Sequence, residues 1–376
     1  MGIRYNLLLN LKNIPGRRIK RKIVVIESDD WGGIRMPSER TFNQLLSNGI
    51  PVDKGAFDKY DTLADKDDLE LLFEVLSSVR DKYGHSAVMT PVTNVANPNF
   101  EKIKDSGFEN YYYEPFSETL IRYGRHSDTI RLWTEGIESG LFVPEFHGRE
   151  HIAVQHWLQK LREGNKKLRM AFDYGYVYVP IEGLHRAVSS FRPAFFMDNP
   201  TQADFLKESI TDGVRLFVGI FNFHPCALIP SDGIFHPLLE KTVVNSGVKY
   251  LNVDYFQSVP DFRGNLKTQF YGVLSKSNIG LIYYHRNCAF EPVHPDYKGI
   301  DLTVKQIETA FRWGKVAIIC THRANFVGGI DCRNRDRGLR ALKDLLNMII
   351  NKWPDVEFMS LASMLRSFYH EHNSHR

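Results

Sequence analysis

The sequence predicts an α/β protein whose parallel strands curl into a barrel. Segments typical of strands and of helices alternate along the 376 residues, as they do in proteins built from βα units. Several strand-like segments are continuous apolar runs, such as Ile23-Val24-Val25-Ile26, which are typical of strands buried on both faces of a parallel sheet. About seven or eight units can be distinguished, a number that favours a barrel over an open sheet.

The alternation gives each element its expected place. The expected strands span residues 23–28, 87–95, 110–113, 141–146, 215–221, 248–254, 279–285, 315–320 and 356–359. The expected helices span residues 38–48, 65–83, 99–105, 129–139, 150–161, 202–211, 235–245, 303–313, 336–351 and 360–369. Ser38 is a typical N-cap, and Gly49, Gly84 and Gly107 stand where helices are expected to end. Residues 163–200, with scattered Tyr, Pro and Gly, indicate an insertion or a long loop over the sheet.

The chain is expected to form one catalytic domain, because no linker or repeat divides it. Residues 1–22 are predicted to be a basic lead-in, residues 23–369 a single (β/α) barrel, and residues 370–376 a solvated tail. A hydrophobic fraction of 43% and a charged fraction of 24% are typical of a soluble globular protein. A net charge of +4 is too small to indicate a nucleic-acid partner.

The most basic segment immediately precedes the first strand and contains Arg17, Arg18, Lys20, Arg21 and Lys22. It predicts either a solvated lead-in or a weak contact with an anionic glycan or a membrane surface. Residues 1–22 lack the features of a signal peptide, and no apolar run approaches the roughly 20 residues of a transmembrane helix. The four cysteines form no CxxC pair, which is typical of reduced thiols. Together these features predict a cytoplasmic protein without a transmembrane segment.

Two polar motifs that follow apolar runs predict a metal site. Asp29 and Asp30 end the first run, and His147 and His151 follow the run Leu141-Phe142-Val143-Pro144. One carboxylate and two imidazoles make a three-ligand site for a divalent ion, which leaves a position open for water. Histidines four residues apart share one face of a helix. The second carboxylate could then accept a proton from that water.

Neighbouring side chains of a regular strand point to opposite faces, so both aspartates cannot reach one site from an unbroken strand. We therefore expect the first strand to end at this pair, with the bend supplied by Trp31-Gly32-Gly33. A polar turn that merely caps a buried strand would use the same glycines, and this alternative stays open.

Three further strand-end residues are candidates for the same cavity. His322 follows the run Val316–Cys320 and is suited to act as a general acid near neutral pH. Arg286 could orient an aspartate or bind a substrate oxygen, and His224 could be a polar or stacking wall residue. The sequence contains no GxGxxG after a strand, no phosphate-binding P-loop and no GxSxG, which argues against nucleotide-dependent and serine-hydrolase chemistry.

The order of these motifs resembles that of the polysaccharide deacetylases, carbohydrate esterase family four. The family's Thr-Phe-Asp-Asp, His-(Ser/Thr)-x-x-His and Leu-x-His signatures are similar to Glu27-Ser-Asp-Asp30, His147-Gly-Arg-Glu-His151 and Cys320-Thr-His322. The resemblance implies a distorted (β/α)7 barrel over roughly residues 22–365. It also implies that Asp29 is the base, that Asp30, His147 and His151 are metal ligands, and that His322 is the general acid. The family's Arg-x-Pro-x-Gly and Asp-x-x-Asp-Trp motifs are not intact, which indicates a divergent branch.

The resemblance further implies a metal-dependent deacetylase of N- or O-acetylated sugars in cell-surface polysaccharide biosynthesis. Its expected cofactor is Zn²⁺, with Co²⁺, Ni²⁺ or Mn²⁺ as alternatives. The expected substrate-binding residues are the strand-end residues Arg286 and His224 and the aromatic Trp31, which could stack on a sugar ring. Two alternatives stay open. One is a glycoside hydrolase on a related barrel, in which Asp29 and Glu145 would flank the glycosidic bond. The other is a barrel that binds glycans without catalysis.

Overall fold

The computed structural model describes residues 3–16, 18–124, 126–180, 188, 190–263 and 265–373. Its main sheet has nine strands, and the pairings recorded between them are all parallel. The strand order is β10 (Ile282–Tyr284), β7 (Tyr250–Asn252), β6 (Ala227–Leu228), β5 (Glu145–Gly148), β2 (Met89–Asn94), β1 (Lys22–Trp31), β12 (Ala317–His322) and β11 (Cys288–Ala289). Strand β13 (Val356–Phe358) pairs with the start of β1. The predicted parallel α/β class is confirmed.

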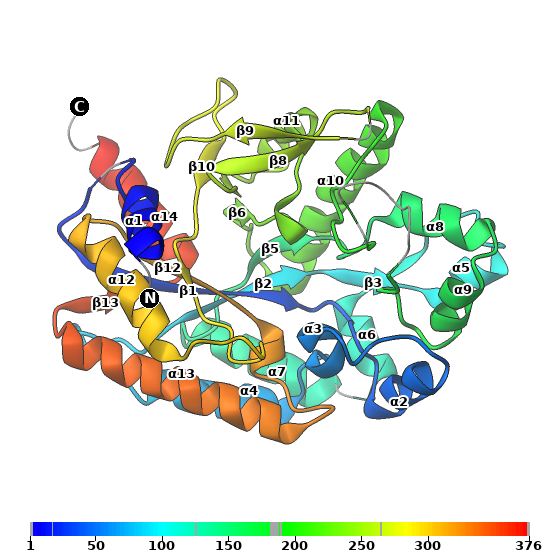
Figure 1. Ribbon diagram of the computed structural model, residues 1–376, viewed down its shortest axis with the longest axis horizontal. Helices are drawn as coiled ribbons and strands as arrows, with labels where there is room; N and C mark the ends of the chain where they lie inside the picture. Colours follow the sequence, from blue (N-terminus) through cyan, green and yellow to red (C-terminus); the bar gives the residue numbers. More distant parts are fainter. Residues whose placement is uncertain are drawn as a thin grey trace.

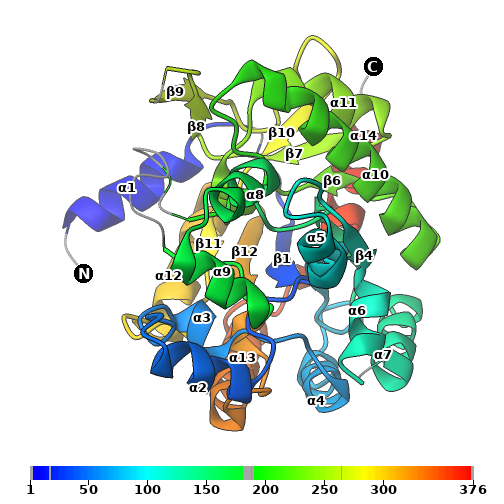
Figure 2. The same ribbon diagram turned by 90° about the vertical axis from the view of Figure 1, so that its right-hand side faces the viewer.

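The two ends of this strand order show that the sheet is curled. Strand β10 lies at one end and β11 at the other, yet only residues 285–287 separate them along the chain. Four residue steps span at most about 15 Å, so the sheet must bend round until its edges face each other. Figure 2 shows β1, β11 and β12 at the centre of the molecule with helices around them.

Helices surround the curled sheet (Figure 1). They are α1 (Ile3–Asn13), α2 (Glu39–Ser47), α3 (Ala56–Tyr60), α4 (Lys66–Ser77), α5 (Phe100–Asp105), α6 (Phe116–Arg122), α7 (His126–Glu138), α8 (Val154–Arg162), α9 (Lys166–Asp173), α10 (Ala203–Phe221), α11 (Glu240–Asn245), α12 (Ile300–Arg312), α13 (Cys332–Lys352) and α14 (Leu361–Asn373). Two antiparallel strand pairs complete the fold: β3 (Ala96–Pro98) pairs with β4 (Tyr113–Pro115) across a connection that contains α5, and β8 (Phe256–Pro260) forms a hairpin with β9 (Leu266–Phe270).

Strand β1 divides its side chains between two apolar cores. Val24 and Ile26 join the large core under the outer helices. Ile23 and Val25 join a smaller core with side chains of α14, such as Leu361. Because strand side chains alternate between faces, the smaller core identifies the inner face of β1, and α14 packs against it near the start of the strand. The carboxyl end of the sheet is therefore the end available for a site.

Several expected elements have different bounds or types. The predicted strand 215–221 is wrong, because these residues form the last two turns of the 19-residue helix α10. The predicted helix 150–161 begins only at Val154. Within the predicted insertion 163–200, α9 is a helix, whereas residues 181–187 and 189 lie outside the described residues. In the lead-in, α1 forms a helix, and α14 extends into the predicted tail, of which residues 374–376 lie outside the described residues.

Two helical glycines should respond oppositely to an added methyl group. A Cβ at Gly338 in α13 would collide with the backbone carbonyl of Asn325, whereas one at Gly219 in α10 would meet nothing within 4 Å. Overpacking typically costs about 1–3 kcal/mol, and alanine is about 1 kcal/mol better than glycine in a helix. We therefore expect Gly338→Ala to lower the free energy of unfolding in urea, and the matched control Gly219→Ala to leave it unchanged or raise it. Equal effects of the two changes would contradict the packing at Gly338.

Candidate metal centre and its cavity

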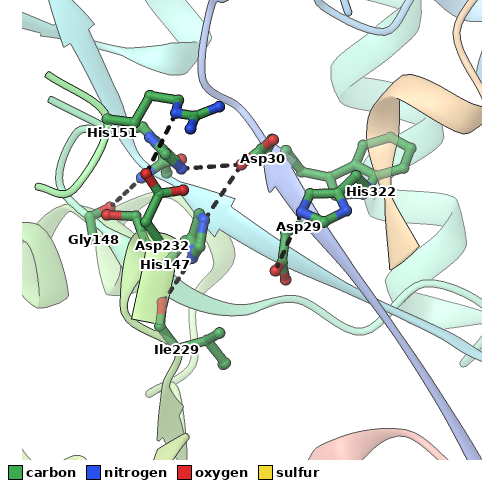
Figure 3. Close-up of polar contacts among 12 residues, drawn as sticks. Asp29, Asp30, His147, Gly148, His151, Ile229, Asp232 and His322 are labelled. Atoms are coloured by element: carbon green, nitrogen blue, oxygen red, sulfur yellow. Dashed lines mark hydrogen bonds and ion pairs between the residues drawn. The ribbon is translucent and has the colours of Figure 1, made fainter. Parts of the chain in front are cut away.

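A cavity of about 350 Å³ lies at the carboxyl end of the sheet. Side chains from several strand ends line it: Asp29 and Asp30 of β1, His147 of β5, His322 of β12, and His151 and Arg286 from the segments that follow β5 and β10. The structure thus brings together all five residues for which the sequence predicts a metal-binding or catalytic role, together with Arg286. Figure 3 shows Asp30 between His147 and His151, with Asp29 and His322 beside it.

Asp30 faces the cavity because β1 contains an extra residue. Ser28 pairs with Pro91 and Trp31 with Thr93, so three steps along β1 match two steps along β2. Asp30 has φ = 72°, in the left-handed region that side-chain-bearing residues seldom adopt. A bulge of this kind re-aims a side chain. Asp29 and Asp30 can consequently point into one cavity, and the bend occurs at Asp30 itself rather than first at the glycines that follow.

Two contacts hold the backbone after the bulge. A Cβ at Gly32 would collide with the backbone carbonyl of Asn94, so only glycine fits there. The buried side chain of Asn97 donates to the Gly32 carbonyl at 2.9 Å and accepts from the Ile34 amide at 2.7 Å. Asn97 is a positioning residue that the sequence did not reveal, because it belongs to a short strand outside the main sheet.

A second bulge positions the histidines. Thr93 pairs with Phe146 and Asn94 with Gly148, so His147 is the extra residue of β5. Gly148 has φ = 133°, and His151 follows in a turn before α8 begins at Val154. The expected helical arrangement of this pair is therefore wrong, since a strand bulge and a turn bring the two imidazoles together.

The three side chains fit a divalent metal ion. The Nε2 atoms of His147 and His151 lie 3.4 Å and 3.2 Å from Oδ1 of Asp30, and one ligand atom from each residue lies within 4.8 Å of the others. All three residues are buried. Nδ1 of His147 is 2.7 Å from the Ile229 carbonyl oxygen, so Nδ1 carries the proton and the Nε2 lone pair is available for a metal.

Charge favours an ionised Asp30. Burial acts to raise the pKa of Asp30, but His151, together with the hydrogen bonds that both histidines donate when they are protonated, holds that pKa well below its ordinary value. Arg35 adds a further positive charge, with Nη1 3.8 Å from Oδ2 of Asp30. A buried anion between two imidazoles and a guanidinium is the setting in which a carboxylate remains a ligand at neutral pH.

Asp29 is held by Arg286 rather than by the histidines. Nη1 and Nη2 of Arg286 donate to the two carboxylate oxygens of Asp29 at 2.6 Å each, and Nε donates to Glu27 at 2.7 Å. Burial acts to raise the pKa of Asp29, but Arg286 more than offsets it and the pKa is lowered. The pKa of Glu27, which is fully buried, stays raised by desolvation despite Arg286. Asp29 is therefore an ionised carboxylate with a fixed orientation.

His322 has an acidic partner that the sequence did not reveal. Its Nδ1 lies 2.6 Å from Oε1 of Glu291, and its Nε2 lies 3.9 Å from Oδ2 of Asp29. Asn325 holds Glu291 by donating to Oε2 at 2.8 Å. Burial acts to lower the pKa of His322, but Glu291 raises it to about 10. Glu291 comes two residues after the short strand β11, and this strand-end position was its only signal in the sequence.

The structure places the other two expected substrate-binding residues away from the cavity. Trp31 is buried in the large core, where it packs against Trp133 and Phe142 and donates to Ser28 at 2.8 Å. His224 is exposed and precedes β6, so it lies at the amino end of the sheet, opposite the cavity. The geometry gives neither residue a contact with a substrate in this cavity.

Glu145, the second acid of the glycoside-hydrolase alternative, does not line the cavity either. Its Oε2 accepts hydrogen bonds from the backbone amides of Cys226 and Ala227, and its Oε1 accepts from the Cys226 thiol. Burial raises its pKa to about 7. Because the carboxyl group of Glu145 is hydrogen-bonded to the start of β6, it cannot flank a glycosidic bond beside Asp29. The glycoside-hydrolase alternative therefore has no second catalytic acid at this position.

No protein-family model matches the chain, and no curated protein matches it in sequence. Among solved structures, the fold is similar to one described as a polysaccharide deacetylase from Mycobacterium smegmatis, with 11% identity, coverage of 95% of each chain and a TM-score of 0.46. One described as a polysaccharide deacetylase from Pseudomonas aeruginosa PAO1 has 11% identity, coverage of 94% of this chain and 92% of the other, and a TM-score of 0.46. One described as a glycoside hydrolase/deacetylase from Parabacteroides distasonis has 9% identity, coverage of 94% and 71%, and a TM-score of 0.44.

The fold is thus similar to that of solved structures described as polysaccharide deacetylases. The assignment of roles in this chain depends on its own residues and distances.

Removal of either imidazole should abolish tight metal binding. We expect the purified protein to bind about one Zn²⁺-class ion per chain, and His147→Ala and His151→Ala to lose it, because two remaining ligands hold such an ion far more weakly. His224→Ala is the matched control, since this histidine is at the opposite end of the sheet. Metal content after dialysis, measured by mass spectrometry, tests the site. Full occupancy in the double variant of His147 and His151 would show that the ion binds elsewhere.

Proposed function

We propose that the protein is a metal-dependent hydrolase that removes acetyl groups from acetylated sugars of an oligo- or polysaccharide. One observation carries this proposal: Asp30, His147 and His151, an aspartate held by arginine, and a histidine held by glutamate all line one cavity. Hydrolysis of an acyl group needs a Lewis acid, a base for the attacking water and an acid for the leaving group. The cavity offers a candidate for each.

A divalent cation held by Asp30, His147 and His151 would polarise the acyl carbonyl and stabilise the negative charge that develops on its oxygen. Zn²⁺ suits one carboxylate and two imidazoles, and Co²⁺, Ni²⁺ or Mn²⁺ are alternatives. The remaining roles belong to the chain's own side chains.

Asp29 is the proposed base, which accepts a proton from the attacking water. Its lowered pKa keeps it ionised, and the two hydrogen bonds from Arg286 prevent it from turning toward the histidines. His322 is the proposed acid, which donates a proton to the departing amine or alcohol through Nε2. Its Nδ1 is engaged by Glu291, so Nε2 is the nitrogen that faces Asp29 and the cavity.

The outer part of the cavity has the polar groups that a sugar requires. Arg192 and Asp232 form an ion pair at 3.3 Å, and both line the cavity together with Asn252 and Asp254. Donors and acceptors in this arrangement suit the hydroxyl groups of a saccharide. The positions of these polar groups favour a sugar ring that lies across them with its acyl group toward Asp30.

Release of acetate without a change in glycan length is the decisive test of the reaction. We expect the mass of an acetylated oligosaccharide to fall by about 42 Da for each acetyl group removed, because hydrolysis replaces the acetyl group by hydrogen and releases acetate, while the number of sugar residues stays constant in mass spectra. Asp29→Asn should reduce turnover by about 10²–10⁴-fold and retain the metal, because Asp30 and both histidines are unchanged. Shortened glycans would instead identify a glycosidase. A variant that lost metal and activity together would show that Asp29 is a ligand rather than the base.

The charge of Glu291 should set the basic limb of the pH profile. The active form needs an ionised Asp29 and a protonated His322, so the rate should fall as the pH rises through the pKa of His322. Because Glu291 raises that pKa, Glu291→Gln should move the basic limb to lower pH by more than about one unit.

Glu291→Asp, which keeps the charge, is the control and should retain most of the original limb. The measurement is kcat/KM against pH for an N-acetylated substrate, with metal content checked at each pH. An unchanged basic limb in Glu291→Gln would exclude His322 as the acid.

A further inference from the structure

Helix α1 is anchored to the body of the protein along one face. Asn10 accepts a hydrogen bond from Nε1 of Trp313 at 2.8 Å, and the Tyr5 hydroxyl accepts one from Gln306 at 3.0 Å. Leu9 and Asn13 of the same face are buried. These contacts tie α1 to α12 and fix which of its faces points outward.

The outward face of α1 is apolar. Leu7, Leu8 and Leu11 are 57%, 56% and 50% exposed, and Ile14 directly after the helix is 43% exposed. The spacing of Leu7, Leu8 and Leu11 places them on one side of a helix. A helix of this kind usually buries such a stripe against something else.

A second exposed apolar pair lies on the hairpin β8–β9. Phe256 and Phe270 are 68% and 60% exposed, and their ring centroids are 5.6 Å apart. The base of the hairpin adjoins the end of α1, since a Cβ at Gly16 would lie 2.6 Å from Cβ of Val273. Figure 2 shows α1 and this hairpin on the same side of the molecule. We call the six side chains the apolar rim: Leu7, Leu8, Leu11, Ile14, Phe256 and Phe270.

Positive charge is concentrated in the same region. The first 26 residues contain seven basic residues and no acidic one, whereas the remaining 350 contain 41 basic and 44 acidic residues. Of the seven, Arg21 and Lys22 pair with Glu357 and Asp355 at the start of β1 and do not belong to this region. Lys12, Arg18 and Lys20 are exposed beside the α1 part of the rim, and Lys267 is exposed on β9. The hairpin turn carries one acid, Asp261, whose Oδ1 accepts from the backbone amides of Arg263 and Asn265. Exposed leucines and phenylalanines with surrounding cations complement an anionic lipid surface.

The apolar rim adjoins the cavity that holds the candidate metal centre. Lys12 belongs to α1 and also lines the cavity. Asp254, which also lines the cavity, lies two residues before Phe256. A surface that contacts α1 and the hairpin together would therefore face the cavity as well.

We propose that the apolar rim docks on a membrane that contains anionic lipid, with its leucines and phenylalanines at the boundary of headgroups and acyl chains. Among the described helices, none has the length and apolarity needed to cross a bilayer, so the contact is peripheral. Docking in this orientation turns the cavity toward the headgroups. The substrate class that follows, which rests on the function proposed above, is an acetylated saccharide attached to a membrane lipid.

Vesicle co-sedimentation tests the docking without reference to catalysis. We expect the full chain to bind vesicles of phosphatidylcholine with one-third phosphatidylglycerol, to bind phosphatidylcholine alone more weakly, and to dissociate at high salt. The triple variant Leu7→Ser, Leu8→Ser, Leu11→Ser should lower the partition coefficient at least about tenfold. Phe256→Ser with Phe270→Ser should lower it independently.

The matched control is Leu46→Ser with Ile121→Ser, which changes exposed apolar side chains on α2 and α6 and should leave binding intact. Equal binding of the triple variant and the control would overturn the docking surface. Sedimentation velocity provides a second test, which asks whether the apolar rim is a dimer interface. A dimer in solution that the triple variant converts to monomer would assign the apolar rim to a second copy of this chain and overturn the membrane proposal.

A separate measurement tests the proposed substrate class. Acetate release is compared between an acetylated saccharide linked to lipid in anionic vesicles and the same saccharide free in solution. We expect the lipid-linked form to react at least about tenfold faster, and the triple variant to lose that preference while keeping its rate on the free form. Vesicle binding without acetate release from either form would contradict the proposed function but not the docking. Equal rates on both forms would overturn the substrate class.

Discussion

The candidate site depends on two backbone bulges that flank one regular strand. Strand β2 keeps its register, while β1 on one side and β5 on the other each contain an extra residue beside it. In a regular β1, the alternation that places Ile23, Val25, Glu27 and Asp29 on the inner face would turn Asp30 away. A side chain with φ near +70° costs on the order of 1–2 kcal/mol. Tight packing of Gly32 against Asn94 and the hydrogen bonds of Asn97 hold the strained backbone in place.

The same geometry brings three carboxylates close together, and each of them has its own positively charged or imidazole partners. Glu27, Asp29 and Asp30 lie within four residues of one strand and are all buried. Arg286 engages Glu27 and Asp29, whereas the two histidines engage Asp30. Unpaired carboxylates this close and this buried would raise one another's pKa values and take up protons. The division of partners leaves Asp30 available as the proposed metal ligand and holds Asp29, the proposed base, in a fixed orientation.

The sequence predicted the strand-end motifs well because apolar runs and the polar residues after them are local signals. It predicted their geometry less well because bulges depend on pairing with a neighbouring strand. The spacing of His147 and His151 indicated a helix, yet the extra residue in β5 achieves the same proximity. The error over His224 has a similar cause. Apart from Arg215 and Gly219, residues 215–221 are apolar. At this length, helix and strand cannot be told apart by pattern. Once this segment is recognised as the end of α10, His224 precedes β6 instead of following a strand.

The short connection between the two edges of the curled sheet, which we call the seam, explains why Arg286 reaches the site. The seam consists of His285, Arg286 and Asn287. These residues join β10 to β11, the two edge strands, which do not pair with each other. Nδ1 of His285 lies 2.7 Å from the Val253 carbonyl on one side. The Asn287 side chain, on the other side, donates to the Val316 carbonyl at 2.9 Å and accepts from the Ile318 amide at 2.9 Å.

The seam residues thus bond to the backbone on either side, as the main chain of a further strand would. Because successive side chains of an extended segment point in opposite directions, Arg286 between them is directed inward, toward Glu27 and Asp29. A barrel closed by a regular strand pair would satisfy those backbone groups with its main chain, and His285 and Asn287 would have no such role. Closure through three residues therefore couples the shape of the sheet to the charge on the proposed base, because the segment that joins the edges also supplies the guanidinium.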